Sequence, residues 1–481
     1  MHRRQLLGYL AGLGTAWTAG CGSTPSRRGP RRGTSPATAG DPTTTPRSKR
    51  DYRHPVLSRD PSTVASAWGL DEVANLGDLG ADKNAEAPID ELLATHATDG
   101  TLLYFPPGKY RIEETVAVNG DGRIGLLGDD AVIVPPAGFD STVLAVGYPD
   151  PMTALFVRGL TFDYRAENTG GRPVLGIADD LILYRDLSVR GVVDVAGDIV
   201  RLDVTSPDGI GIVDGLSLPD GATVPSVTGC EVGDNNHGDV EFYDCHIAGF
   251  PDNGLYADPP EGSIRVYGGF FRNNGVAGVR ITTSEPSLVH GARVRCDDSD
   301  AVGVNMRGIR LRGGYDHLVE DCVVELLDVT SSDGAVTIAS ELASATIRNC
   351  HLHVDADGVN AIRVKSPNDD ADEAVREGPF RFENVRITGN AADSAAVQAA
   401  DRRGCTFENL QIHQSGDDRD GIVTTNVEGK LFDTCISVTN EPLSLTNSQI
   451  ERRNVHLGND PETERCGTDS PPADGTPTPP E

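Results

Sequence analysis

A short run of alternating residues, AIRVK at 361–365, places two cations on the same side of an expected strand. The chain has only 5 lysines among its 481 residues, and one of them, Lys365, follows Arg363 by two positions. Successive side chains of a strand point to opposite faces, so Ile362 and Val364 point inward and the two cations face solvent. Cations placed in this way can bind the carboxylate of a ligand. One of them can also act as the base that removes the proton from the carbon next to that carboxylate.

The same alternation recurs along the chain and exposes further cations and one aromatic ring. Its copies are GLYAD (254–258), GVRIT (278–282), GIRLR (308–312), AVTIA (335–339), AIRVK (361–365) and AVQAA (396–400). Their outward residues include Tyr256, Arg280, Arg310, Arg312 and Gln398. A row of this kind fits an anionic polysaccharide, because arginine binds a carboxylate through two hydrogen bonds and tyrosine stacks on a sugar face.

Acidic turns between these strands offer a different explanation for the cations. CDDSD (296–300), SSDG (331–334) and SGDDRDG (415–421) are rich in carboxylates, and salt bridges to such turns would neutralise charge locally. Exposed pairs contribute little stability, so they do not explain why the cations cluster on one register. The sequence leaves both explanations open.

A second pattern predicts the fold that would hold this row. The pattern spans six positions. Positions one and six are apolar, positions two and five are spacers, position three is Asp, Asn or Gly, and position four is small or apolar, as in FYDCHI (242–247) and FENLQI (407–412). Successive copies are mostly 23 to 35 residues apart, and one step of 58 residues, from Leu187 to Cys245, is predicted to hold two coils. Short strands at such a period, with Gly- and Asp-rich turns, predict a parallel β-solenoid. No helical period supports a leucine-rich repeat, and constant offsets argue against a β-sandwich.

The segment ahead of the coils, NLGDLGADKNAEAPIDELLATHATDGTLLYFPPGKYRI (75–112), resembles the opening of the pectin-lyase-like superfamily. Pro88 suits the first turn of a helix, and Ile89, Leu92 and Leu93 give that helix one apolar face that can close the end of the solenoid. The resemblance covers roughly residues 70–457. It implies an all-β fold, a right-handed parallel β-helix with a short N-terminal capping helix, which we assign to residues 61–457.

Similar β-helix lyases use Arg or Lys as the base, often with Ca²⁺ held by carboxylates. The resemblance therefore implies three candidate catalytic residues, four candidate substrate contacts and three candidate Ca²⁺ ligands. The catalytic candidates are Lys365, Arg363 and Arg310; the substrate contacts are Arg280, Arg312, Tyr256 and His246; the metal ligands are Asp297, Asp298 and Asp300. A hydrolase would need two paired carboxylates, and the Gly-His-Gly element of similar hydrolases is absent, so lyase chemistry ranks ahead of hydrolysis. A non-catalytic surface or adhesion protein is the alternative.

Charge excludes some partners. The net charge is −30, although residues 1–50 hold 9 of the 42 basic residues and 1 of the 72 acidic ones. An acidic chain with so little lysine resembles proteins of extreme halophiles. Such a surface argues against nucleic acid and anionic membranes as partners. The partner predicted from the outward cations is an acidic polysaccharide or cell-envelope glycan.

The two ends of the chain predict export. Residues 1–21 resemble a twin-arginine signal with a lipobox-like end, which would lipidate Cys21 and anchor the protein at the cell surface. Residues 22–60 are expected to be a Thr-, Pro- and Arg-rich tether, and residues 458–481 a Pro-rich tail, both disordered.

The cysteines are predicted to be buried. Cys245, Cys322 and Cys350 share one inward register, where an unpaired stack of thiols is favoured. A disulfide between Cys322 and Cys350 stays possible outside the cell.

Overall fold

The computed structural model describes residues 52–54, 56–302, 305–461 and 466. The predicted signal, Cys21 and most of the predicted tether lie outside the described residues. Three helices are α1 (Pro61–Trp68), α2 (Asp90–His96) and α3 (Glu373–Glu377). None of the helices in the described ranges is long and apolar enough to cross a membrane.

The strands pair in parallel from coil to coil and form three ladders, which we call A, B and C. Ladder A runs through β5 (Val116–Val118), β7 (Leu144–Val146), β9 (Val174–Arg185), β11 (Val200–Val204), β14 (Cys230–Val232), β17 (Asn253–Ala257), β20 (Ala277–Thr282), β23 (Ile309–Gly314), β26 (Val336–Leu342), β29 (Ile362–Val364), β32 (Ala395–Ala400), β35 (Asp420–Thr425) and β38 (Leu443–Thr446).

Ladder B runs through β1 (Glu72–Asn75), β3 (Thr101–Phe105), β6 (Arg123–Val134), β8 (Met152–Asp163), the second half of β9, β12 (Ile210–Asp214), β15 (Asp239–Tyr243), β18 (Ile264–Tyr267), β21 (Leu288–His290), β24 (His317–Glu320), β27 (Ala345–Arg348), β30 (Phe380–Glu383), β33 (Cys405–Glu408), β36 (Glu428–Phe432) and β39 (Gln449–Arg453).

Ladder C runs through β2 (Asn84–Pro88), β4 (Gly108–Arg111), the second halves of β6 and β8, β10 (Ser188–Arg190), β13 (Ser217–Leu218), β16 (His246–Ala248), β19 (Phe270–Arg272), β22 (Arg293–Asp297), β25 (Val323–Asp328), β28 (His351–Val354), β31 (Arg386–Gly389), β34 (Gln411–Gln414), β37 (Cys435–Ser437) and β40 (His456–Gly458).

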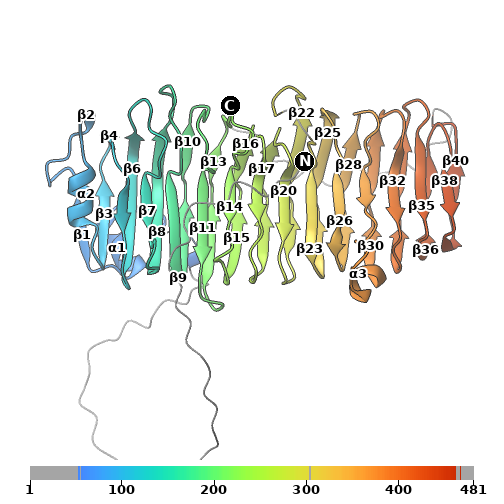
Figure 1. Cartoon of the computed structure of the whole chain (residues 1–481), viewed down its shortest axis with the longest axis horizontal. Coiled ribbons are helices and arrows are strands. Elements are labelled where there is room, and N and C mark those ends of the chain that lie inside the picture. Colours follow the sequence, from blue (N-terminus) through green and yellow to red (C-terminus); the bar gives the residue numbers. More distant parts are fainter. Residues whose placement is uncertain (1–51, 55, 303–304, 462–465, 467–481) are drawn as a thin grey trace, which may run out of the picture. The chain divides into compact units, whose positions relative to one another are not determined.

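The fold predicted from the sequence, an all-β parallel β-helix, is confirmed. The described residues form a parallel β-solenoid of about 13 turns, in which the coils follow one another in chain order (Figure 1). One continuous apolar core fills the coils from Leu76 to Val438. The step of 58 residues holds two coils, as expected, because Leu216 on the intervening coil is buried between the registers of Leu187 and Cys245.

The corner between ladders B and C is a tight turn with a left-handed residue. Asp244, Asp321, Asn349, Asn384 and Asn409 have φ between 46° and 56°, a region that Asn and Asp tolerate better than other side chains. The amide of Asn384 donates to Asn349 at 3.1 Å and accepts from Asn409 at 2.8 Å, which links three successive coils. This corner explains the Asp, Asn or Gly in the repeated sequence pattern.

The helix predicted near residue 89 exists, with one correction. Ile89 and Leu93 of the α2 region are buried in the main core, and α2 lies at the blue end of the coils (Figure 1). Pro88 is the last residue of β2 rather than part of the first helical turn. The chain stays extended up to that point because the backbone N–H of Ile89 bonds to the carbonyl of Arg111 at 3.0 Å.

Helix α1 was not predicted, although its ends carry clear signals. The Asp60 carboxylate accepts from the Thr63 N–H at 2.8 Å, and Gly69 ends the helix with φ of 69°. Trp68 stacks on Phe156 at 5.1 Å, outside ladder B. Tyr52, within the segment expected to be a tether, packs against the same ring at 5.6 Å.

The cysteines follow the expectation in part. Cys245, Cys322 and Cys350 are buried and unpaired, so the thiol stack is confirmed and Cys322 and Cys350 form no disulfide. A disulfide that the sequence reasoning missed joins Cys435 to Cys466. Cys466 lies in the segment expected to be a tail, whose residues from 467 onward lie outside the described part of the chain.

Candidate functional site

Ladder A brings the predicted cations into one row. Its pairings place Tyr256 beside Arg280, Arg280 beside Arg310, Arg310 beside Thr337, Thr337 beside Arg363, and Arg363 beside Gln398. The residues on either side of each belong to the core, so the row occupies the outward register that the sequence predicted. We call these six residues the cation row.

One end of the row is neutralised by an acidic turn. Arg280 lies over the Tyr256 ring, with its guanidinium carbon 4.3 Å from the ring centre, and its ion pair with Asp258 is 3.2 Å long. The Tyr256 hydroxyl donates to the same carboxylate at 2.8 Å. Arg312 lies at the edge of this group, 4.0 Å from Asp258 and 3.6 Å from Glu341. These two arginines and the tyrosine therefore fit the salt-bridge explanation.

Lys365 is also engaged by a carboxylate. Its ammonium donates to Asp333 at 2.6 Å, and Arg307 donates to the same oxygen at 2.6 Å. Asp333 belongs to the acidic SSDG turn, and these two cations lower the pKa of its carboxyl although burial opposes the shift. The contact of Lys365 with Asp333 is therefore the kind of salt bridge to an acidic turn that the second explanation predicts.

Arg310 and Arg363 are different, since among the described residues neither forms an ion pair or a side-chain hydrogen bond. Both are half-buried, and Nε of Arg310 is buried without a hydrogen-bond partner. Burial lowers the pKa of Arg310 to about 10, and the positive charges of Arg307, Arg280 and Arg312 add to the effect. Burial also lowers the pKa of Arg363.

Thr337 lies between these two arginines. It is fully buried, and its hydroxyl has no hydrogen-bond partner. Buried polar atoms without partners are rare in folded proteins and call for an explanation. Two more occur two coils away on ladder A, Nε of Arg280 and the hydroxyl of Thr282. With Nε of Arg310, four unpaired polar atoms of the described residues thus lie on three neighbouring strands that carry the row.

Charge is unbalanced around the row. In the described ranges, six cations here have only three carboxylates as ion-pair partners. The cations are Arg280, Arg307, Arg310, Arg312, Arg363 and Lys365, and the carboxylates are Asp258, Asp333 and Glu341. A local excess of positive charge on a chain of net charge −30 is what an anionic ligand would balance.

The sequence reasoning missed a carboxylate group that continues the row. Arg201 and Glu231 lie on the same register, directly before Tyr256. Arg201 contacts Asp203 at 2.9 Å and Glu231 at 3.4 Å, and Arg172 joins Glu231 at 3.1 Å. The alternation of VRLDV at 200–204 could have revealed it, since it is the same pattern as in GVRIT.

Two carboxyl groups in this cluster have raised pKa values. Burial raises the pKa of Asp198 to about 6, and the neighbouring Glu231 carboxylate adds to the shift. The hydrogen bond from the Thr228 N–H and the positive charge of Arg172 lower the pKa, but by less. Burial also raises the pKa of Asp203, despite its contact with Arg201. A carboxyl group with a pKa of about 6, as in Asp198, can exchange protons with a substrate.

The structure separates the remaining candidates from the row. His246 lies on ladder C, where its ring packs against Phe270 at 5.5 Å. Its pKa is lowered, first by burial and then by Arg272. It therefore cannot contact the same stretch of ligand as Arg280, because it projects from a different side of the coil.

The predicted Ca²⁺ ligands do not converge in the described part of the chain. Asp297 is held by Arg272 at 2.9 Å and Arg295 at 2.7 Å. These hydrogen bonds outweigh the effect of burial and lower the pKa of Asp297 to about 2. Asp298 and Asp300 are exposed in the following turn, and the three side chains form no cluster of metal-binding geometry.

Comparison with solved structures finds distant likenesses. The chain is similar to PfbA, a surface adhesin of Streptococcus pneumoniae, with a TM-score of 0.46 and 14% identity over 80% of this chain and 93% of that one. It is similar to the A-module of the Azotobacter vinelandii mannuronan C-5 epimerase AlgE4, with a TM-score of 0.38 and 15% identity over 80% and 100%. A family 28 exopolygalacturonase of Yersinia enterocolitica gives a TM-score of 0.28 and 10% identity over 80% and 78%.

No protein-family model matches the sequence, and a search of curated proteins finds no relative. At such TM-scores the likeness to solved structures carries no argument about function. What the chain does must be argued from its own residues.

Proposed function

We propose that the protein is exported to the cell surface, where it binds a uronate-containing polysaccharide along ladder A and cleaves it as a lyase. One observation carries the proposal: in the described part of the chain, Arg310 and Arg363 are half-buried cations without ion-pair partners, on either side of a buried hydroxyl that is also unpaired. A carboxylate bound over Thr337 would supply acceptors for both guanidinium groups and for the hydroxyl.

The bound carboxylate prepares the substrate for elimination. The positive charge of Arg363 next to it would stabilise the negative charge that develops when the adjacent carbon loses its proton. Arg310 is the candidate base, because burial lowers its pKa to about 10 and it forms no ion pair in the described residues, and it must be deprotonated before it acts. Arg310 takes the proton, a carbon–carbon double bond forms, the bond to the leaving sugar oxygen breaks, and this oxygen takes up a proton from water.

A non-catalytic binding or adhesion function is the second candidate. It is favoured by the ion pair of Lys365 with Asp333, which occupies one of the three candidate bases with a structural contact. Binding then rests on the same contacts, and no bond is broken.

The deciding experiment incubates the purified protein with a panel of polyuronates, in low and molar salt, with and without Ca²⁺. Absorbance of unsaturated uronates and reducing ends are followed together, and binding is measured in parallel. The variants are Arg310→Ala and Arg363→Ala, and the matched control is Arg386→Ala, an exposed arginine on ladder C.

A rise of both signals that is lost in Arg310→Ala supports the lyase. Reducing ends without unsaturated products would instead indicate hydrolysis, and would direct attention to Asp198 and Asp203. Binding that needs Arg310 and Arg363 but yields neither product supports the second candidate. Binding that is the same in all variants, or no binding to any polyuronate, would refute a ligand site at the row.

A further inference from the structure

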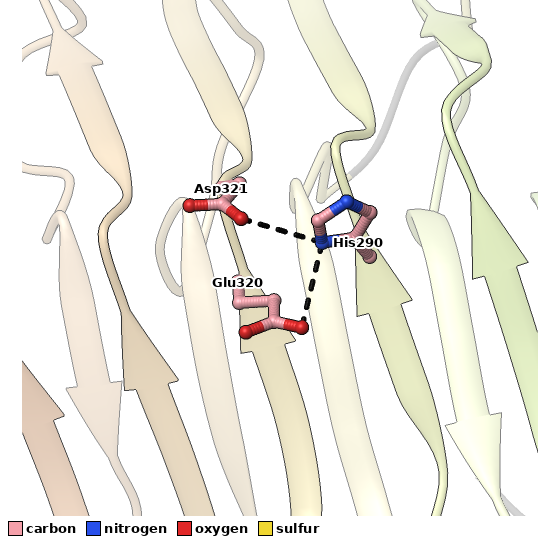
Figure 2. Close-up of side chains that lie close together, drawn as sticks. All are labelled: His290, Glu320 and Asp321. Atoms are coloured by element: carbon pink, nitrogen blue, oxygen red, sulfur yellow. Dashed lines mark ion pairs between the residues drawn. The ribbon is translucent and has the colours of Figure 1, made fainter. Parts of the chain in front are cut away.

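A cluster of possible metal ligands lies on ladder B, away from the cation row. His290 is the last residue of β21 and Glu320 the last of β24, and these two residues are paired directly in the ladder. Asp321 follows in the tight corner turn. Figure 2 shows the imidazole of His290 facing the carboxylates of both Glu320 and Asp321.

The distances in this cluster suit a shared ion better than hydrogen bonds. Nδ1 of His290 lies 3.4 Å from Oε1 of Glu320 and 3.4 Å from Oδ2 of Asp321. Hydrogen bonds between an imidazolium and a carboxylate are shorter, at about 2.7–2.9 Å. In a tetrahedral site with bonds of about 2.0–2.1 Å, neighbouring ligand atoms are about 3.3–3.4 Å apart.

The nitrogen that faces the carboxylates makes no hydrogen bond. Among the described residues Nδ1 of His290 is buried without a hydrogen-bond partner, although the side chain as a whole is 43% exposed. A buried ring nitrogen between two carboxylate oxygens needs a proton or a metal ion to make this contact favourable. The three donor atoms all lie within 4.8 Å of one another.

The surrounding contacts hold two of the ligands in place. Nε of Arg348 donates to Oε2 of Glu320 at 2.8 Å, which leaves Oε1 to face His290. Asp321 has φ of 56°, and its N–H bonds to the Arg348 carbonyl at 3.2 Å. Such supporting contacts orient metal ligands in known sites.

We propose that His290, Glu320 and Asp321 bind a divalent transition-metal ion, with Zn²⁺ as the best match. One imidazole nitrogen and two carboxylate oxygens form a donor set that Zn²⁺ accepts, whereas Ca²⁺ and Mg²⁺ prefer oxygen ligands alone. The ion joins two neighbouring coils of ladder B. This site is separate from the cation row of ladder A, so it stands or falls independently of the proposed function.

The test measures Zn²⁺ binding by calorimetry on the purified full chain after removal of metals, with Ca²⁺ as a second titrant. The ligand variants are His290→Ala, Glu320→Gln and Asp321→Asn. The matched control is His237→Ala, because His237 faces a single carboxylate, Glu261, at 3.2 Å. Thermal unfolding with and without Zn²⁺ provides a second readout that also shows whether each variant is folded.

We expect one Zn²⁺ per chain that raises the melting temperature, and a loss of affinity of at least about 10-fold in each ligand variant. The His237→Ala control should bind as the wild type does. Zn²⁺ binding that survives His290→Ala, or that Ca²⁺ reproduces with equal affinity, would overturn the proposal. Absence of Zn²⁺ binding to the wild type would overturn it as well.

Discussion

Arg310 and Arg363 lie on the same outward register of ladder A, two coils apart, with the buried Thr337 between them. Neighbouring strands are about 4.8 Å apart, so the Cα atoms of the two arginines are separated by about 10 Å. Both side chains are long enough to reach a group placed over Thr337. Neither of them has an ion-pair partner in the described residues, in contrast to Arg280, Arg312 and Lys365.

If one carboxylate contacts both arginines, their substitutions should not be additive. Arg310→Ala and Arg363→Ala should each weaken polyuronate binding by about 10- to 100-fold, as expected for a charge-assisted hydrogen bond. The double variant should lose less than the sum of the two free energies, by at least about 0.5 kcal/mol. Equilibrium binding of the four proteins measures this coupling, and strict additivity would place the two cations on separate ligand groups.

Thr337→Val separates ligand binding from stability. Valine has nearly the shape of threonine but lacks the hydroxyl, which is buried without a partner. Stability should therefore stay the same or rise by about 1 kcal/mol, because an unsatisfied polar group is removed. Polyuronate binding should fall by about 10-fold, because the ligand loses a donor. A fall in melting temperature without a change in binding would show that the hydroxyl has a structural role.

Asp198 should give the stability a characteristic pH dependence. Its pKa is raised to about 6 in the folded protein, from 3.8 for the ordinary group. The folded state therefore binds more protons between these values, and the stabilisation from protonated Asp198 is full below pH 4 and is lost as pH rises through 6. Asp198→Asn cannot titrate, so its free energy of unfolding should gain about 1–3 kcal/mol relative to the wild type between pH 4 and 7.

Denaturant unfolding at several pH values measures this difference. Asp297→Asn is the matched control, because its pKa is lowered to about 2 and its titration ends below pH 4. The difference between that variant and the wild type should be flat from pH 4 to 7. A flat difference for Asp198→Asn as well would show that Asp198 has an ordinary pKa.

The register of the row was predictable because it depends on a local property. In GVRIT, GIRLR and AIRVK the apolar residues alternate with cations, and the requirement to bury those apolar residues fixes which side faces out. The ion pairs were not predictable. Whether Lys365 or Arg363 reaches Asp333 depends on how the turn of the preceding coil folds, and sequence spacing does not encode this.

The composition of an acidic turn does not reveal which of its side chains are buried. The composition of the acidic turn SGDDRDG indicates an exposed segment, yet Arg419 within it is fully buried and bonds to Gln414 at 2.9 Å and to the carbonyl of Val359 at 2.8 Å. An arginine flanked by three aspartates suggests surface charge. One partner, Gln414, ends the strand before the turn, and the other, Val359, lies on another coil, so only the three-dimensional structure identifies them.

The disulfide between Cys435 and Cys466 should stabilise the C-terminal coils. It closes a segment with a sequence separation of 31, which corresponds to about 3–4 kcal/mol of unfolded-state entropy. Cys466→Ser should therefore expose β37 and β40 to proteases at lower denaturant concentration than in the wild type. Reducing agent should produce the same change in the wild type and none in the variant. Equal resistance of both proteins under oxidising conditions would argue against the bond.

Arg402 and Arg403 are neighbours in sequence with opposite roles, which allows a matched test. Arg402 is fully buried and donates to the backbone carbonyls of Lys365 at 2.9 Å, Leu342 at 3.0 Å and Ala339 at 2.8 Å. Arg403 is exposed and pairs with Glu377 at the surface. Burial lowers the pKa of Arg402 to about 10, so it stays charged at neutral pH.

Arg402→Met should destabilise the protein by about 3 kcal/mol or more, because buried carbonyls lose their donors. Arg403→Ala should change the stability by less than about 0.5 kcal/mol, as for other exposed pairs. Since Arg402 holds the backbone of Lys365, polyuronate binding should weaken in Arg402→Met under conditions where it is still folded. Chemical denaturation and polyuronate binding are measured on both variants. Equal stability of the two would show that the buried hydrogen bonds of Arg402 do not stabilise the strands that carry the cation row.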